Sequence, residues 1–156
     1  MRCSPADIKE VTRIMTHESV FDLVSDDGSP SKENFEKYLD GALHNVGIYV
    51  LTPGPGMVIM YAPINYVTYD IHIAAVKGEA GRQDALNNTL KSALWMADNT
   101  PIQKYMVTVP TLYPNVARFC EALYLVKEGC LTKAYLKDGV LYDVEIYGIQ
   151  LPDVLK

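Results

Sequence analysis

The stretch from Asn115 to Gly148 constrains the fold of this chain more than any other part of its sequence. It opens with a short amphipathic helix, whose apolar residues recur at spacings of three, four and seven: Val116, Phe119, Cys120 and Leu123. Strand-forming residues follow, and an Asp138-Gly139 turn joins two further strands. The pattern predicts a helix that leads into a strand and then an antiparallel hairpin.

The first third of the chain predicts two short helices. Ser4 and Pro5 are good residues for a helix start, and apolar residues recur at helical spacing after them. Ser31 is expected to cap the second helix, and Gly41 is expected to close it. The polar segment between the two helices ends in turn-forming residues.

The middle of the chain alternates between strands and helices. Runs of β-prone residues predict four strands, at Val46 to Leu51, Met57 to Tyr61, Val67 to Val76 and Lys104 to Val109. A longer helix is expected from Arg82 to Asp98, with an apolar stripe of Leu86, Leu90, Ala93, Leu94 and Ala97. The predicted order is α-α-β-β-β-α-β-α-β-β. We therefore expect an α/β fold, a mixed sheet with crossover helices, in a single domain over residues 1–156.

Composition excludes several classes of function. The chain has 156 residues and a net charge of −5, so we expect no nucleic-acid partner. No apolar run reaches membrane-spanning length, and three cysteines without a paired motif argue against a disulfide framework. The three histidines are too scattered to form a metal signature, so no metal is expected. These features favour the cytoplasm.

The predicted order resembles that of the GNAT acyltransferases, whose members transfer an acyl group from coenzyme A to an amine. The best local match runs from Arg118 to Gly129, where Leu123-Tyr124-Leu125 aligns with the Leu-Gly-Phe that follows a helix in the family. Farther upstream, Thr16-His17 and the run from Ser25 to Pro30 resemble a GNAT-like group encoded by tailed bacteriophages, some of which are labelled head-assembly proteins.

This resemblance implies a cleft for acyl-CoA between two splayed parallel strands. The pyrophosphate would lie on the loop that opens the long helix, at Gly81, Arg82 and Gln83. A backbone N–H from the stretch Ala74, Ala75 and Val76 would polarise the thioester carbonyl. Asn115 matches an asparagine that contacts CoA in the family, although capping of its own helix would explain it equally.

The loop also departs from the family pattern. Glu79 and Asp84 are acids in a stretch that should hold a pyrophosphate, and such repulsion costs on the order of 1 kcal/mol. Acids at a helix N-terminus are otherwise ordinary because they complement the helix dipole. A self-capped helix without a ligand is the alternative interpretation of these residues.

The resemblance suggests a proton donor and a base. Cys120 aligns with the tyrosine that protonates the leaving thiolate in many GNAT enzymes, although core packing would also explain a cysteine on this apolar face. Tyr124 takes that role only if the helix is rotated from this alignment. Asp70 and His72 share one face of a strand beside the cleft and are candidates for the base; a structural role is the alternative.

On the acceptor side, the resemblance places His17, Asp26 and Asp27 where carboxylates hold an amine. The alternative is a simple turn, because Ser, Asp and Gly are preferred turn residues.

Two main hypotheses of function follow. The first is an N-acyltransferase that uses acetyl-CoA and an amine acceptor. The second is a GNAT-shaped binding or assembly protein that has lost catalysis; binding of another nucleotide or a pantetheine-like molecule in the same cleft is a third. An open splay between the Val67 and Lys104 strands would favour a ligand, whereas a cleft plugged by Gln83 or Met106 would exclude CoA. Eleven tyrosines against three phenylalanines make a homodimer or a protein partner plausible.

Overall fold

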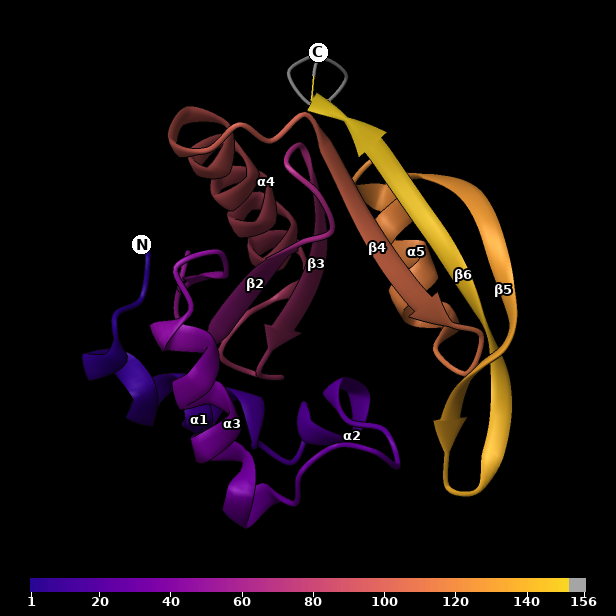
Figure 1. The fold of residues 1–156 in the computed structure, drawn as a ribbon, viewed down its shortest axis with the longest axis horizontal. Coiled ribbons are helices and arrows are strands. Elements are labelled where there is room, and N and C mark those ends of the chain that lie inside the picture. The colour runs from indigo at the N-terminus through magenta and orange to yellow at the C-terminus, as the bar shows by residue number, and fades with distance from the viewer. Residues whose placement is uncertain (152–156) are drawn as a thin grey trace.

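A mixed six-stranded sheet forms the centre of the computed structural model, which describes residues 1–151 (Figure 1). The strands lie in the order β1-β2-β3-β4-β6-β5. Their bounds are β1 Tyr49–Leu51, β2 Met57–Pro63, β3 Thr68–Ala75, β4 Lys104–Pro110, β5 Val126–Lys137 and β6 Val140–Gln150. β3 and β4 are parallel, and all other neighbours are antiparallel. The predicted mixed α/β fold is confirmed.

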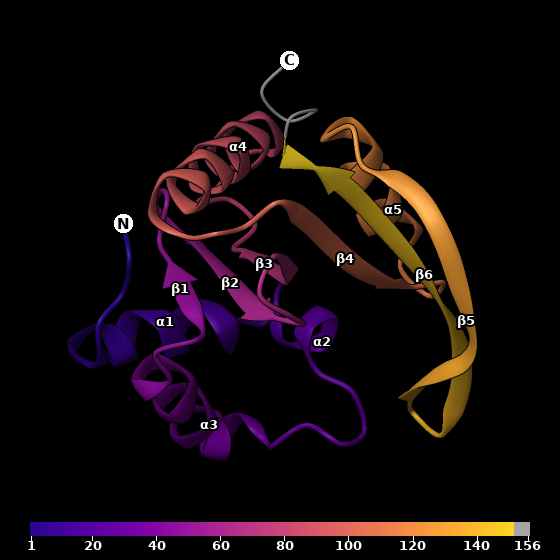
Figure 2. The same ribbon diagram turned by 45° about the horizontal axis from the view of Figure 1, so that its top comes forward.

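Helices cover both faces of this sheet (Figure 2). The helices are α1 Ile8–Met15, α2 Phe21–Val24, α3 Lys32–His44, α4 Arg82–Asn99 and α5 Pro114–Ala122. α1 and α3 pack on one face in a core that includes Val11, Phe35 and Leu39, whereas α4 and α5 pack on the other face. Among the described residues, no helix is long and apolar enough to cross a membrane.

Successive side chains of β3 point to opposite faces of the sheet, so they enter the two cores alternately. Tyr69, Ile71 and Ile73 belong to the core beneath α4 and α5. Ala74 belongs to the core beneath α1 and α3, and His72 shares that face of the strand. One strand therefore presents candidate residues to both sides of the molecule.

The buried face of α4 differs from the predicted stripe. Leu90 and Leu94 are exposed, and the residues that face the sheet are Met96 and four smaller ones: Ala85, Thr89, Ser92 and Ala93. Two buried tyrosines explain the difference, because their hydroxyl groups reach the helix. Tyr61 is hydrogen-bonded to Ser92 Oγ at 2.6 Å, and Tyr105 Oη donates to the carbonyl of Ala93 at 2.6 Å.

The N-terminal boundaries also differ from the predictions. α1 begins at Ile8 after a 3₁₀ turn, Pro5–Asp7, and its N-cap residue is Asp7 rather than Ser4. α3 follows Ser31 as predicted but runs past Gly41 to His44. The short α2 helix and the late start of β1 at Tyr49 were not predicted; Val46 is instead strongly exposed.

The Asp138-Gly139 turn is confirmed. Lys137 pairs with Val140, which leaves a two-residue connection, and both turn residues have positive φ, at 50° and 75°. This is the backbone geometry of a tight hairpin turn, for which Asp-Gly is a preferred sequence.

Candidate functional site

The sheet opens between β3 and β4. Their register pairs end at Asp70 and Met106, although β3 stays paired with β2 as far as Ala75 and β4 stays paired with β6 as far as Pro110. The second half of each strand therefore has no partner across this gap. The open splay that would favour a ligand is present, and neither Gln83 nor Met106 is among the residues that line the cavity below it.

Backbone direction decides which N–H groups face the splay. The N–H of Val76 donates to the carbonyl of Gly56 at 2.8 Å, so it points toward β2. Because successive residues of a strand point their N–H groups to opposite neighbours, Ala74 also points toward β2, whereas Ile73 and Ala75 point toward β4. Within the stretch Ala74 to Val76, from which one such N–H was predicted, the N–H of Ala75 is the one oriented toward the splay. Ile73 joins it, a residue that the sequence alone did not single out.

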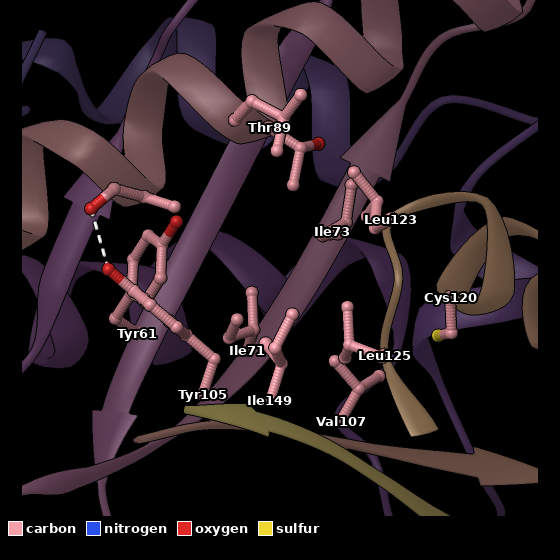
Figure 3. Close-up of a pocket in the computed structure, with 12 residues that line it drawn as sticks. Tyr61, Ile71, Ile73, Thr89, Tyr105, Val107, Cys120, Leu123, Leu125 and Ile149 are labelled. Atoms are coloured by element: carbon pink, nitrogen blue, oxygen red, sulfur yellow. Dashed lines mark hydrogen bonds between the residues drawn. The ribbon is translucent and has the colours of Figure 1, made fainter. Parts of the chain in front are cut away.

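An apolar cavity lies beneath the splay, between α4 and the end of α5 (Figure 3). The cavity is small, and the figure of about 430 Å³ for its empty space includes the open solvent at its mouth. Its lining comes from both splayed strands, from their neighbours and from the two helices: Tyr61, Ile71, Ile73, Thr89, Leu90, Ala93, Tyr105, Val107, Cys120, Leu123, Leu125 and Ile149.

Cys120 lies at the edge of this cavity (Figure 3) and is buried. Burial, assisted by the nearby Glu121 carboxylate, raises the pKa of its thiol to about 11. At neutral pH the group is therefore a protonated thiol that can donate a proton, not a nucleophilic thiolate. Both interpretations made from the sequence remain compatible with its position, because Cys120 is packed in the core and also lines the cavity.

Tyr124 lies outside the cavity. Its side chain is 78% exposed and its φ is +64°, in the left-handed region where glycine is favoured. The N–H of Leu125 donates to the carbonyl of Cys120, and that of Tyr124 donates to the carbonyl of Glu121. These two bonds form a Schellman motif, which ends helices at a left-handed residue. Tyr124 thus stands where the family has glycine, and the alignment that put Cys120 at the acid position agrees with the backbone.

The loop between β3 and α4 has the features of an anion site. Gly81 is the N-cap residue of α4 and makes no side-chain cap hydrogen bond, and Arg82 and Gln83 are exposed in the first turn. Gln83 Nε2 donates to Asn87 along the helix surface. The Asp84 carboxylate folds back toward Gly81, with Oδ2 3.3 Å from the position that a Cβ would take there. No side chain caps the positive N-terminal end of α4, but the Asp84 carboxylate lies close to it.

Glu79, the other acid of this loop, is neutralised by Arg13 of α1. The guanidinium donates to both carboxylate oxygens of Glu79, at 2.7 and 2.8 Å, and also pairs with Glu10. These bonds to Arg13 lower the pKa of the Glu79 carboxyl. The Glu79 side chain also lies against Gly56, where φ is +64° and a Cβ would be 2.5 Å from that of Glu79, so this position requires glycine. Sequence reasoning missed Arg13, which is 66 residues away along the chain.

Asn115 does not cap α5. The N-cap residue is Tyr113, and Asn115 Oδ1 accepts a hydrogen bond from Arg118. The capping alternative raised from the sequence is wrong, because the helix begins one residue earlier, at Pro114.

His72 and Asp70 form a pair on the face of the sheet opposite the cavity. His72 Nε2 lies 3.2 Å from Asp70 Oδ2, and the histidine side chain is half exposed. The second oxygen of Asp70 is buried and has no hydrogen-bond partner among the described residues. Because the splay connects the two faces, this pair and Cys120 lie on opposite sides of the same opening.

The predicted acceptor residues take part in local structure. Asp26 accepts from the N–H of Gly28 and from Ser29 Oγ, as in an Asx turn. Asp27 accepts from the N–H groups of Asp138 and Gly139, at 2.8 Å each, and these bonds lower its pKa. His17 Nδ1 is hydrogen-bonded to Ser19, whose hydroxyl accepts from the N–H of Lys77.

A buried lysine completes the contact between this loop and the β5–β6 hairpin. Lys137 is 7% exposed, and its ammonium donates to the carbonyls of Asp22 and Ser25 and lies 2.9 Å from an Asp22 carboxylate oxygen. Although burial opposes the charge, the Asp22 carboxylate keeps the pKa of Lys137 above its ordinary value. Tyr113 and Tyr135 also donate to carbonyls of the loop. We call residues 22–27 with the hairpin tip 135–139 the acceptor-side clamp; only its Asp-Gly turn and the turn residues at 26–27 were visible in the sequence.

Comparison with known proteins identifies the fold. No protein-family model matches the chain, and no curated protein matches its sequence. Solved structures do match: a spermidine N-acetyltransferase from Vibrio cholerae in complex with CoA and spermine has a TM-score of 0.77 at 14% identity, over 100% of this chain and 96% of that chain. A chimera of that enzyme with hSSAT has a TM-score of 0.79 at 14% identity, over 100% of this chain and 96% of that one. A mutant of the Vibrio cholerae enzyme has a TM-score of 0.73 at 16% identity, over 99% of this chain and 94% of that chain. The described chain therefore has the GNAT acyltransferase fold, as its own strand order indicated.

Proposed function

We propose that this protein is an N-acyltransferase that moves an acyl group from acyl-CoA, with acetyl-CoA as the simplest donor, to an amine. The splay of β3 and β4 carries the proposal: it opens beside the uncapped N-terminus of α4 and above an apolar cavity. An anion fits the helix end and the exposed Arg82, and an apolar thioester fits the opening.

The residues of the chain support direct attack of the amine on the thioester. The N–H groups of Ile73 and Ala75 are oriented to polarise the thioester carbonyl. His72, held by Asp70, accepts a proton from the amine as the C–N bond forms and the C–S bond breaks. Cys120 can return a proton to the leaving thiolate from the other side of the opening, because its thiol is protonated at neutral pH.

The acceptor is a cationic amine in this proposal. The net charge of −5 and the Asp70 carboxylate favour a cation on this side of the sheet. The structural neighbours are named for spermidine and spermine, which makes polyamines the first acceptors to try. The roles of His17, Asp26, Asp27, Gln83 and Asn115 in binding stay predictions. The bacteriophage origin, the cytoplasmic location and a homodimer or protein partner stay predictions as well.

Calorimetric titration with acetyl-CoA and CoA tests the proposal first. We expect micromolar binding, which at a hundredfold excess of ligand over Kd would stabilise the fold by about 2.7 kcal/mol. His72→Ala and Cys120→Ala should then lower kcat with a polyamine acceptor while CoA affinity is kept. Absence of both heat and thermal stabilisation at millimolar ligand would contradict the proposal. Binding without turnover on any amine would favour a binding or assembly protein that has lost catalysis.

A further inference from the structure

One line of leucines on α4 is left partly in solvent. Leu90 and Leu94 are 37% and 45% exposed, although both belong to the apolar stripe expected from the sequence. They follow Leu86 at intervals of four residues, a spacing that places side chains in one row along a helix. The hydroxyl groups of Tyr61 and Tyr105 bind the neighbouring side of α4 to the sheet. The leucines therefore lie at the margin of the buried face, where two of them face solvent.

This row of leucines ends in a charge on each side. Arg82 lies four residues before Leu86, and it is exposed. Asp98 lies four residues after Leu94, and it is exposed as well. We call these residues, at a constant interval of four on a helix at the outside of the sheet (Figure 2), the α4 row: Arg82, Leu86, Leu90, Leu94 and Asp98. The row is symmetric in position about Leu90 and opposite in charge at its two ends.

A row of this kind is complementary to a reversed copy of itself. When two α4 helices pack antiparallel about a twofold axis at Leu90, Leu90 lies against the partner's Leu90 and Leu86 lies against the partner's Leu94. Arg82 then lies toward the partner's Asp98 at both ends. Rows with a spacing of four are the ridges that interdigitate in the commonest class of helix contact. A parallel arrangement would instead bring like charges together.

We propose that the α4 row is an interface on which two copies of this chain associate with their α4 helices antiparallel. Burial of the exposed leucines favours association, and the terminal charges select the antiparallel direction. Both charges stay close to solvent, so they contribute little to the stability of a single copy. The Arg82 guanidinium has five N–H donors, so a contact with the partner leaves donors for an anion at the helix end. The inference does not depend on the proposed acyltransferase function.

Analytical ultracentrifugation over a dilution series tests this interface. We expect a contact made by one helix per copy to bury less than the roughly 800 Å² per partner of a standard interface, and therefore a weak dimer that dissociates on dilution. Leu90→Asp places two carboxylates at the twofold axis and should raise the Kd of the dimer about tenfold or more. Leu141→Asp is the matched control: Leu141 is 53% exposed on β6 and lies outside the row, so the Kd should stay unchanged.

A charge exchange tests the antiparallel direction and leaves the leucines in place, so it stays informative if Leu90→Asp does not fold. At low salt, Arg82→Asp alone should raise the Kd about fivefold, because it puts a carboxylate against the partner's Asp98. Adding Asp98→Arg in the same chain should restore the Kd. A protein that is monomeric at every concentration, or a dimer whose Kd is the same in Leu90→Asp, would overturn the interface. A Kd that does not respond to Arg82→Asp would overturn the antiparallel arrangement.

Discussion

At position 124 a tyrosine holds a backbone conformation that costs any residue with a Cβ about 1–2 kcal/mol. The Schellman bonds at the end of α5 impose this conformation, and the exposed ring adds little packing to offset its cost. The strain matters for the site because the same turn leads from Cys120 to Leu125, two residues of the cavity wall.

We expect Tyr124→Gly to raise the free energy of unfolding by about 1 kcal/mol, measured by urea denaturation. Tyr66→Gly is the matched control: Tyr66 is equally exposed but has no positive φ, so the added backbone freedom should lower stability there. Equal losses in both variants would contradict the assignment of strain to position 124.

Among the elements, α1 braces the loop that precedes α4. Arg13 binds both carboxylate oxygens of Glu79 while it also pairs with Glu10, and this contact offsets part of the conflict between an acidic loop and a pyrophosphate. The pair is half exposed, so its contribution to stability is small. The pair matters more because Arg13 reduces the negative charge of the loop.

Arg13→Gln should weaken CoA binding about fivefold, because it frees the Glu79 carboxylate to repel the phosphates. The double variant Arg13→Gln with Glu79→Gln should restore the affinity, and Glu79→Gln alone should change it little. Calorimetry on the four proteins gives the coupling between the two side chains. Failure of the second substitution to rescue the first would show that Arg13 acts in another way.

The acceptor-side clamp contributes to the stability of the folded protein in a way that depends on pH. Hydrogen bonds from Gly139 and Asp138 lower the pKa of Asp27 in the folded protein. The stability that this group contributes is therefore present above its unfolded pKa, near 3.9, and is lost as pH falls through the lower folded pKa.

Asp27→Asn should lower Tm at neutral pH, and its Tm should converge on that of the unaltered protein as pH falls from about 4 to about 2. Asp98→Asn is the control, since Asp98 is exposed at the end of α4 and should show no such convergence. A constant difference in Tm across this range would mean that the charge of Asp27 does not contribute to stability and that only the shape of its side chain does.

Across the whole molecule, two halves of the sheet meet at only three pairs of residues between β3 and β4. The helix-side core, the α4 crossover and the acceptor-side clamp hold the halves together around the splay. Figure 1 shows the hairpin of β5 and β6 reaching toward the segment after α2, where Lys137 makes its contacts. The clamp thus joins the β5–β6 hairpin to the segment around α2.

Lys137→Met should lower the free energy of unfolding by about 1–3 kcal/mol, because the carbonyls of Asp22 and Ser25 each lose one of their two donors and the Asp22 carboxylate loses its cation. It should also speed hydrogen exchange in residues 22–27 and in the hairpin tip. Lys127→Met, which removes an exposed pair with Glu145, should cost less than about 1 kcal/mol and leave that exchange unchanged. Similar effects in both variants would show that the clamp does not join the two halves.

Element types and their order followed from local patterns. The Asp138-Gly139 turn, the strand alternation around Ile71 and His72, and the short apolar face at Cys120 depend on residues close in sequence, and each lies where it was expected. The ends of the elements and the buried faces of the helices were predicted less accurately. The predicted stripe of α4 was right at Ala93, which is buried, and at Leu86, which packs against the core, but wrong at Leu90 and Leu94, which are exposed. The side of the helix that faces the sheet is the one bonded to the hydroxyl groups of Tyr61 and Tyr105, from other strands.

The sequence by itself determined the fold, because hydrophobic periodicity, turn residues and helix ends each depend on residues that are close together in the chain. Only the tertiary structure decided what the site contains. Arg13 neutralises Glu79, and Lys137 joins the hairpin to residues 22–25, through contacts between segments far apart in sequence. The direction of the Ile73 and Ala75 N–H groups depends on the register in which β3 pairs with β2. Charge pairing, backbone direction and cavity shape are set by the packing of distant elements, which no local pattern encodes.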